Sequence, residues 1–188
     1  WQDIKVKHLL AHASGLTSFE FVALENARNS DSALTHEAIV RALLTEANPQ
    51  EQLEMLGKEA LAFLPGEKSD YKNANYLLLG LIIESVTGQP YADYIREQLL
   101  RPAGLTETVF REDQAPRLAS PYSGGQQIAD ATAETLYSFG GAISTASEVH
   151  QFIRALQTGR LVSEHQVERM SQPLLFNRGY GWLISDMF

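Results

Sequence analysis

The chain has 188 residues, of which 44% are hydrophobic and 20% charged, an ordinary balance for one globular unit with a sizeable core. Fifteen basic residues against 23 acidic ones give a net charge of -8, and no run of Lys or Arg is present. We therefore expect no nucleic acid partner. The absence of cysteine excludes disulfides, thiolate metal sites and a cysteine nucleophile.

The first expected element is a short helix from Asp3 to His12, with apolar residues at near-helical spacing, a possible cap at Asp3 and a stop at Gly15. A loop from Thr17 to Glu25 follows. A second, amphipathic helix is expected to begin at a Thr35 cap and to end at Asn48-Pro49.

The strongest element is a helix from Asn73 to Thr87, which Gly88 closes. Its leucines and isoleucines cover nearly the whole circumference, so we expect it to be the buried central helix. Glu84 within it is expected to be a buried carboxylate with a cationic partner rather than an acid catalyst. The next helix is expected to run from Pro90 through Leu100.

Short elements complete the chain. Helical periodicity is lost from residue 112 to residue 141, where Ser123-Gly124-Gly125 indicates a small hairpin. Capping-box spacing occurs at Thr145-Ala146-Ser147-Glu148 and at Ser163-Glu164-His165-Gln166, and each box predicts the start of a helix. The predicted fold class is mainly α with a small β hairpin.

The apolar runs indicate whether the chain crosses a membrane, and the two ends indicate whether sequence is missing. The longest apolar run, from Tyr76 to Ile83, is far shorter than the roughly 20 residues of a membrane span, so we expect none. The chain begins at Trp1 without an initiator methionine or a signal sequence, and it stops at Phe188 soon after a strand-like run. We expect sequence to be missing at both ends.

The stretch from Phe63 to Tyr91, FLPGEKSDYKNANYLLLGLIIESVTGQPY, carries most of the functional information. It resembles the serine β-lactamase-related family, which includes class C β-lactamases, D-Ala-D-Ala carboxypeptidases and related esterases. The Pro-Gly turn, the Tyr-x-Asn element, the Leu-Leu-Gly helix and the Thr-Gly-x-Pro-Tyr exit follow in the family's order. Residues 6–16, 99–108 and 139–148 are similar to the same family, so the resemblance covers nearly the whole chain.

The resemblance implies a fold and a mechanism. The fold is the β-lactamase/transpeptidase-like α/β fold, of which residues 1–188 would form the helical lobe as a single domain, with both flanking segments of the α/β lobe absent. The mechanism is an acyl-enzyme one built from Ser-x-x-Lys, Tyr-x-Asn and a Lys-Thr-Gly or His-x-Gly strand. The serine attacks a carbonyl carbon, the lysine and the tyrosine move protons, and backbone amides stabilise the oxyanion.

Tyr71 and Asn73 are the catalytic candidates that this scheme implies. Tyr71 would be the general acid/base, and Asn73 would orient the catalytic lysine and hold a substrate amide. Lys72, between them, departs from the family, which usually has a small residue there. For the bare triplet, the alternative is structural: Asn73 as a helix N-cap beside a packed tyrosine. The family-like sequence around the triplet favours the catalytic interpretation.

The serine nucleophile is not found in this chain. The one Ser-x-x-Lys match, Ser69-Asp70-Tyr71-Lys72, overlaps the Tyr-x-Asn element, and one short segment cannot supply two opposing walls of a cleft. We therefore do not assign Ser69 as the nucleophile. Lys-Thr-Gly, His-x-Gly and Gly-x-Ser-x-Gly do not occur either.

Other candidates lie near the N-terminus. Phe19 and Glu20 are substrate-binding candidates because this region borders the cleft in the family; the alternative is a partly buried loop anchored by phenylalanines. His8 and His12 have the spacing of a metal-binding pair but lack the Glu of the zinc-protease motif. We expect both to pack or cap, with His12-Ala13-Ser14-Gly15 bracing a turn. No metal or cofactor is expected.

The predicted function is that of a fragment of a serine hydrolase of β-lactamase, D-alanyl-D-alanine carboxypeptidase or esterase type, inactive alone. The full-length protein would act on a β-lactam, a D-Ala-D-Ala peptide or an ester, in the periplasm or another extracytoplasmic place. Two alternatives stay open: a non-catalytic helical module that binds peptides or another protein, and an all-α interaction domain with a purely structural likeness. Self-association through apolar surface exposed by the missing lobe is a further hypothesis.

Overall fold

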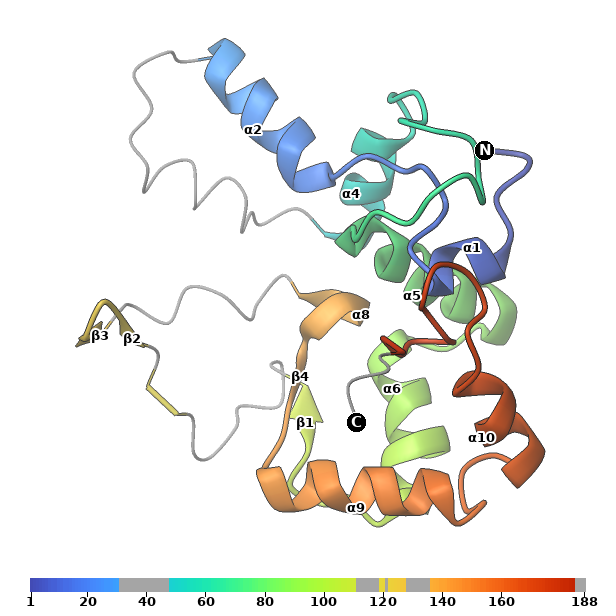
Figure 1. The fold of residues 1–188 in the computed structure, drawn as a ribbon. Coiled ribbons are helices and arrows are strands. Elements are labelled where there is room, and N and C mark those ends of the chain that lie inside the picture. Colours follow the sequence, from blue (N-terminus) through green and yellow to red (C-terminus); the bar gives the residue numbers. More distant parts are fainter. Residues whose placement is uncertain (31–47, 111–118, 121, 128–135, 185–188) are drawn as a thin grey trace.

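The computed structural model describes residues 1–30, 48–110, 119–120, 122–127 and 136–184. Helices dominate these residues (Figure 1), and they are α1 (Val6–Leu10), α2 (Phe19–Ser30), α4 (Pro49–Leu56), α5 (Asn73–Thr87), α6 (Tyr91–Ile95), the π-helical η1 (Arg96–Leu100), α7 (Arg101–Ala103), α8 (Tyr137–Gly140), α9 (Ala146–Gln157) and α10 (Glu164–Met170). The strands form two antiparallel pairs, β1 (Val109–Phe110) with β4 (Ala142–Ile143), and β2 (Tyr122–Ser123) with β3 (Gln126–Gln127). The mainly α class with a small β hairpin is confirmed. In the described part of the chain, no helix is both long and apolar enough to cross a bilayer.

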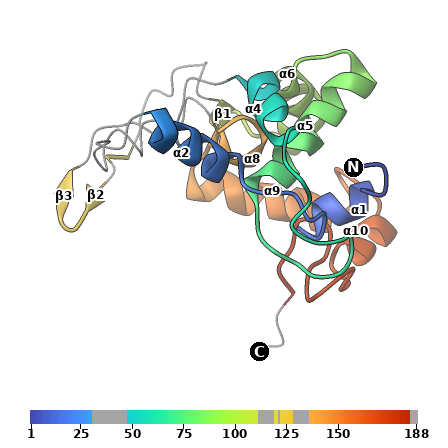
Figure 2. The same cartoon turned by 90° about the horizontal axis from the view of Figure 1, so that it is seen from above.

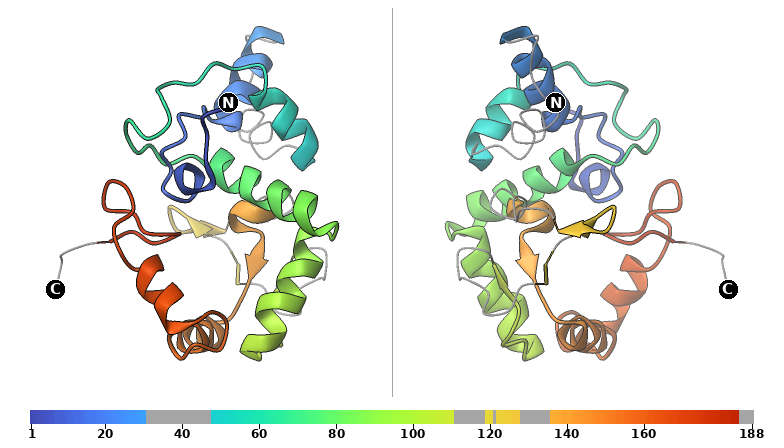
Figure 3. Two further views of the ribbon diagram at one scale, coloured as in Figure 1. Left: turned by 90° about the vertical axis from the view of Figure 1, so that its right-hand side faces the viewer. Right: turned by 90° about the vertical axis from the view of Figure 1, so that its left-hand side faces the viewer.

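Helix α5 runs between two groups of helices, with α1, α2 and α4 on one side and α6, α9 and α10 on the other (Figures 1 and 3). Two hydrophobic cores correspond to these groups. The first contains Leu9, Leu16, Phe19, Leu56, Ala74 and Leu77, and the second contains Leu100, Ala103, Leu105, Phe110 and Ala155. Tyr91 packs on the second core and Tyr137 on the first, and their ring centroids lie 5.1 Å apart, so this pair joins the cores.

The bounds of α5 match the predicted helix, and Gly88 ends it in the left-handed conformation at φ 68. The helix is not buried along its whole length, however. The N-terminal half packs into the core, whereas Val86 near the C-terminal end is 80% exposed, so the expectation of full burial is wrong for that half. Within the described residues Glu84 forms no ion pair, contrary to the prediction: its Oε1 accepts the Tyr91 N–H at 2.7 Å and so caps the start of α6.

The N-terminal helix is shorter than predicted. α1 begins after Lys5, so Asp3 is not its cap. His8 is the capping partner instead, because its Nδ1 accepts the Lys5 N–H at 3.2 Å. The expected packing or capping role of His8 is thereby confirmed. The helix stops before His12, whose φ of 52 lies in the left-handed region.

One segment was assigned wrongly from sequence, and the start of another helix was not predicted. The predicted loop from Thr17 to Glu25 is mostly helix α2, because the Ser18 hydroxyl accepts the Phe21 N–H at 3.2 Å and caps it. Asn48-Pro49 starts helix α4: Asn48 Oδ1 accepts the two N–H groups of Gln50 and Glu51, and Pro49 occupies the first turn. The helix predicted from Thr35 lies outside the described residues.

Two of the C-terminal elements begin or turn at the residues predicted for them. Gly124 and Gly125, both at positive φ, join β2 to β3 and confirm the hairpin. Ser163 caps α10 with a complete capping box, as predicted. The pairing of β1 with β4 was not predicted, because it joins residues far apart in the sequence.

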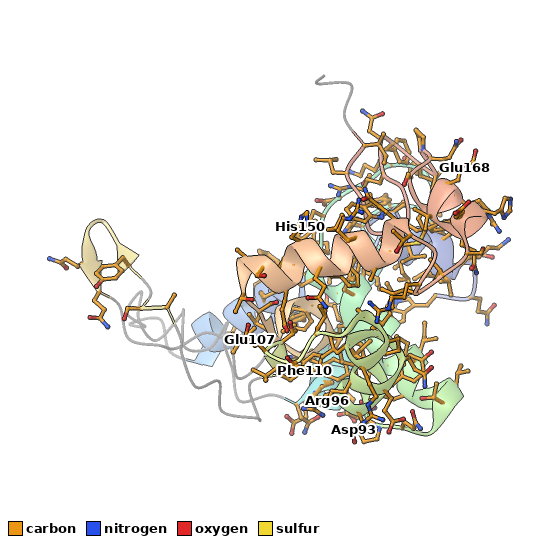
Figure 4. The ribbon with its side chains drawn as sticks, turned by 90° about the horizontal axis from the view of Figure 1, so that it is seen from below. Asp93, Arg96, Glu107, Phe110, His150 and Glu168 are labelled. Carbon is orange, nitrogen blue, oxygen red and sulfur yellow. The ribbon has the colours of Figure 1, made fainter. Side chains whose placement is uncertain are left out.

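Glu148 departs from the capping box predicted for α9. Thr145 Oγ1 accepts the Glu148 N–H at 3.2 Å, but the Glu148 carboxylate accepts hydrogen bonds from Thr106 N–H, Glu107 N–H and the Thr108 hydroxyl. Burial raises the pKa of Glu148, and these hydrogen bonds outweigh that effect and hold the pKa below its usual value. The carboxylate thus ties α9 to the segment before β1; Figure 4 labels Glu107 in that segment and Phe110 in β1.

Candidate active site

The segment Tyr71-Lys72-Asn73 enters α5, and Lys72 rather than Asn73 is the N-cap residue. Lys72 has an extended backbone and makes no side-chain capping bond, and Asn73 is the first residue of the helix. The Asn73 amide Nδ2 donates to Glu20 Oε1 at 2.7 Å. The structural alternative, in which Asn73 caps the helix, is therefore wrong. Tyr71 is 59% exposed, so its phenol is accessible to a ligand.

Ser69 and Lys72 do not form a Ser-x-x-Lys pair one helical turn apart, because the chain from 69 to 72 is not helical. The Ser69 hydroxyl donates to Ala11 O at 2.9 Å and accepts from Arg178 Nε at 3.1 Å. Lys72 Nζ lies 3.1 Å from the Asp70 carboxylate. Both side chains therefore serve the local fold, and Ser69 stays unassigned as a nucleophile.

The turn His12-Ala13-Ser14-Gly15 pairs with the loop that leads to Tyr71. Three backbone bonds join them: Asp70 N–H to His12 O (2.8 Å), Gly66 N–H to Ala13 O (2.7 Å) and Ala62 N–H to Gly15 O (2.8 Å). Gly15 has φ 81, and a Cβ there would lie 2.0 Å from the Phe63 carbonyl oxygen. Only glycine fits this approach. The expected bracing role of the turn is confirmed.

A buried polar pair fixes the start of α5 to this turn. The Ser14 hydroxyl donates to Asn75 Oδ1 at 2.6 Å, and Asn75 Nδ2 donates to Lys72 O at 3.1 Å. Both side chains are only 1% exposed, so leaving either without its partner costs about 1–3 kcal/mol. The backbone on either side of Asn73 is thereby held rigidly.

His12 supports the Tyr71 ring. The imidazole centroid lies 4.3 Å from that of Tyr71 and 5.1 Å from that of Tyr76, and Nδ1 accepts the Lys72 N–H at 3.3 Å. Burial, and then the charge of Arg178, lower the pKa of His12 to about 4. The ring is neutral near pH 7, which is the state in which Nδ1 can accept a hydrogen bond.

This pKa predicts a pH dependence of stability. The folded pKa of about 4 lies below the ordinary value of 6.5, so the unfolded state binds the extra proton between these values. The contribution of His12 to the free energy of unfolding is fully present above pH 6.5 and is lost as the pH drops toward 4. The loss is on the order of 2 kcal/mol. Urea unfolding at pH 7.5, 6 and 5 measures this slope.

A matched pair of variants isolates the His12 contribution. His12→Asn should flatten part of the slope, with the remainder coming from His8, whose pKa is lowered by burial and by Lys7 and Lys5. His150→Asn, at an exposed position on α9 (Figure 4), should leave the slope unchanged. An unaltered slope in His12→Asn would show that His12 does not titrate as the structure indicates.

A tight hairpin brings Arg178 to the same place. Phe176 and Asn177 both have positive φ, and the Leu174 N–H donates to Arg178 O at 2.7 Å. The guanidinium carbon lies 5.9 Å from the centroid of the Tyr71 ring. This C-terminal loop lies beside α1 in Figures 1 and 2. No local pattern marks Arg178 in the sequence, because its partner Ser69 is 109 residues away.

The two substrate-rim candidates have different surroundings. Glu20 lies at the site, where it contacts Asn73. Phe19 is 5% exposed and packs in the core, with its ring centroid 5.3 Å from that of Phe139. Phe19 is therefore an anchor of α2, and we do not retain it as a substrate contact. Among the described residues, no group of three His, Cys, Asp or Glu side chains is placed to bind a metal ion.

The chain is similar to known proteins over nearly its whole length. The sequence model of the Beta-lactamase family matches residues 1–186. The chain belongs to the β-lactamase family. It is 36% identical over 107 residues to a putative D-alanyl-D-alanine carboxypeptidase of Escherichia coli K12, a match that covers 57% of this chain and 22% of that protein. It is 29% identical over 214 residues to penicillin-binding protein 4* of Bacillus subtilis, covering 99% of this chain and 44% of that protein.

Solved structures share the fold of this β-lactamase family chain. A D-stereospecific amidohydrolase from Streptomyces sp. superposes with a TM-score of 0.76 at 23% identity, over 96% of this chain and 56% of that one. The chain thus has the β-lactamase/transpeptidase-like fold and spans less than half the length of the two curated relatives above.

Proposed function

We propose that this chain supplies one wall of the active site of a serine hydrolase that works through an acyl-serine intermediate. Tyr71 is the general acid/base of that site, and Asn73 orients the catalytic lysine and holds a substrate amide. The observation that supports this most is the Tyr71-Lys72-Asn73 corner itself. Tyr71 is exposed and packed against His12. Asn73 is the first residue of a rigid helix, and its side chain does not cap that helix.

The reaction follows from these roles. A serine supplied from outside the 188 residues attacks the carbonyl carbon, and its proton passes to the lysine or to Tyr71. The bond between the carbonyl carbon and the leaving group then breaks, Tyr71 donates a proton to that leaving group, and Asn73 binds the substrate amide. Water later hydrolyses the acyl-serine and restores the serine. Because the chain provides neither the nucleophile nor the Lys-Thr-Gly or His-x-Gly strand, it has no turnover alone.

The substrate class is an amide or ester: a β-lactam, a D-Ala-D-Ala peptide or a simple ester. The names of the relatives, a carboxypeptidase and a penicillin-binding protein, favour D-Ala-D-Ala peptides and β-lactams, and the amidohydrolase favours amides more generally. An extracytoplasmic location of the full-length protein accords with such substrates. In this proposal the chain is the helical lobe of the domain.

Acylation tests the proposal. The full-length gene product and the 188-residue chain are each incubated with a fluorescent penicillin and with a fluorophosphonate, and labelled protein is detected by gel fluorescence. The full-length product should be labelled by at least one probe, and the isolated chain by neither. Labelling of the isolated chain, or no labelling of the full-length product by either probe, would contradict the proposed function.

A further inference from the structure

Glu20 joins the start of α2 to Asn73 through a chain of hydrogen bonds. Its Oε1 accepts from Asn73 Nδ2 at 2.7 Å, and its Oε2 accepts from the Ser18 hydroxyl at 2.5 Å. The Ser18 oxygen in turn accepts the Phe21 N–H that it caps. Both carboxylate oxygens of Glu20 are therefore engaged by groups fixed at the starts of two helices.

The contact determines which way the Asn73 amide points. A carboxylate accepts hydrogen bonds, and the amide oxygen has no hydrogen to give, so only Nδ2 can face Glu20. Oδ1 and the second Nδ2 hydrogen are left for other partners. In the proposed reaction the oxygen would accept from the lysine ammonium, and the hydrogen would bind the carbonyl of a substrate amide. If the amide were flipped, Nδ2 would face the lysine ammonium and Oδ1 would face the substrate carbonyl, and neither pair could form a hydrogen bond.

Other hydrogen bonds anchor the start of α5 independently of this contact. Asn75 and Ser14 already anchor the start of that helix, and His12 accepts the Lys72 N–H. Nor does Glu20 form an ion pair with a basic side chain in the portion of the chain that the structure describes. The remaining consequence of the contact is the orientation of the Asn73 side chain.

We propose that Glu20 is a positioning residue that sets the amide orientation of Asn73 for catalysis, acting through Asn73 rather than on the substrate. The inference rests on the proposed function. It makes the N-terminal end of α2, with Ser18 before the helix and Glu20 in its first turn, part of the machinery of the site, although none of its residues need touch the reacting atoms.

A double-mutant cycle tests this in the full-length gene product. The acylation rate by a fluorescent penicillin is measured for wild type, Glu20→Ala, Asn73→Ala and the double variant. Glu20→Ala should lower the rate about 10- to 100-fold, as expected for misplacement of a catalytic group. The double variant should be no slower than Asn73→Ala, because the effect of Glu20 passes through Asn73. Glu25→Ala, an exposed position on the same helix, is the matched control and should act like wild type.

A second measurement does not depend on activity. The side-chain amide resonances of Asn73 in a ¹⁵N–¹H spectrum should shift in Glu20→Ala and not in Glu25→Ala. The inference is overturned if those resonances stay in place, if Glu20→Ala is acylated like wild type, or if the two substitutions are additive. Failure of the wild-type protein to be acylated at all would instead contradict the proposed function, and the resonances would still report on Glu20.

Discussion

Phenylalanine in place of Tyr71 is expected to lower the acylation rate of the full-length gene product by about 10²- to 10⁴-fold, the usual contribution of a general acid/base. The substitution removes only the hydroxyl, and the ring keeps its contact with His12 at 4.3 Å. Because Tyr71 is largely exposed, the melting temperature should change little. Labelling kinetics and a thermal melt on the same preparation measure both quantities.

Tyr76→Phe is the matched control for that result. Tyr76 packs on the same imidazole, with ring centroids 5.1 Å apart, and its hydroxyl donates a long hydrogen bond to Leu10 O at 3.4 Å. Its loss should leave the acylation rate within about threefold of wild type, as for a hydroxyl outside the chemistry. If Tyr71→Phe and Tyr76→Phe behave alike, Tyr71 is not the proton-transfer residue.

The second large effect concerns Gly15, which lets the bracing turn approach the loop before Tyr71. In Gly15→Ala the new Cβ would lie 2.0 Å from the Phe63 carbonyl oxygen, a backbone atom that cannot move away without breaking the pairing. We expect a loss of about 3 kcal/mol or more in the free energy of unfolding, from the clash added to the cost of positive φ. Acylation should fall as well, since this pairing leads the chain to Tyr71.

Gly88→Ala is the control that separates the energetic cost of the clash from the cost of the left-handed backbone conformation. Gly88 has a similar φ of 68, but a Cβ there meets nothing within 4 Å. Its substitution should cost only about 1 kcal/mol, the penalty for a left-handed alanine. Urea unfolding of both variants gives the comparison. Equal losses would mean that the approach of Phe63 to Gly15 does not govern the stability of the turn.

Local signals explain what the sequence predicted of the fold. The bounds of α5 were predictable because a continuous apolar pattern ends at Gly88, and α10 because Ser163 and Gln166 form a capping box within four residues. The start of α4 at Asn48-Pro49 was not predicted, because the same dipeptide can end one helix or start another. The partial exposure of α5 depends on which elements pack against it, and a single helix pattern does not contain that information.

In the candidate site, too, local sequence patterns indicate some residues, whereas contacts between distant residues appear only in the folded chain. Tyr71 and Asn73 could be proposed from the sequence because their neighbours carry the family's order of motifs. The contact of Glu20 with Asn73 spans 53 residues, and that of Arg178 with Ser69 spans 109, so neither could be predicted from a local pattern. The bracing role of His12 was predicted, but its low pKa was not, because burial and Arg178 arise only in the folded chain.

Peptide mass spectrometry of the acylated full-length gene product tests the central claim most directly. The claim is that these 188 residues contribute Tyr71 and Asn73 to an acyl-serine site whose nucleophile they do not contain. The adduct should map to a serine outside them that is followed three residues later by lysine, and its yield should fall in Tyr71→Phe. An adduct on Ser69, or on any other serine of these 188 residues, would contradict the claim.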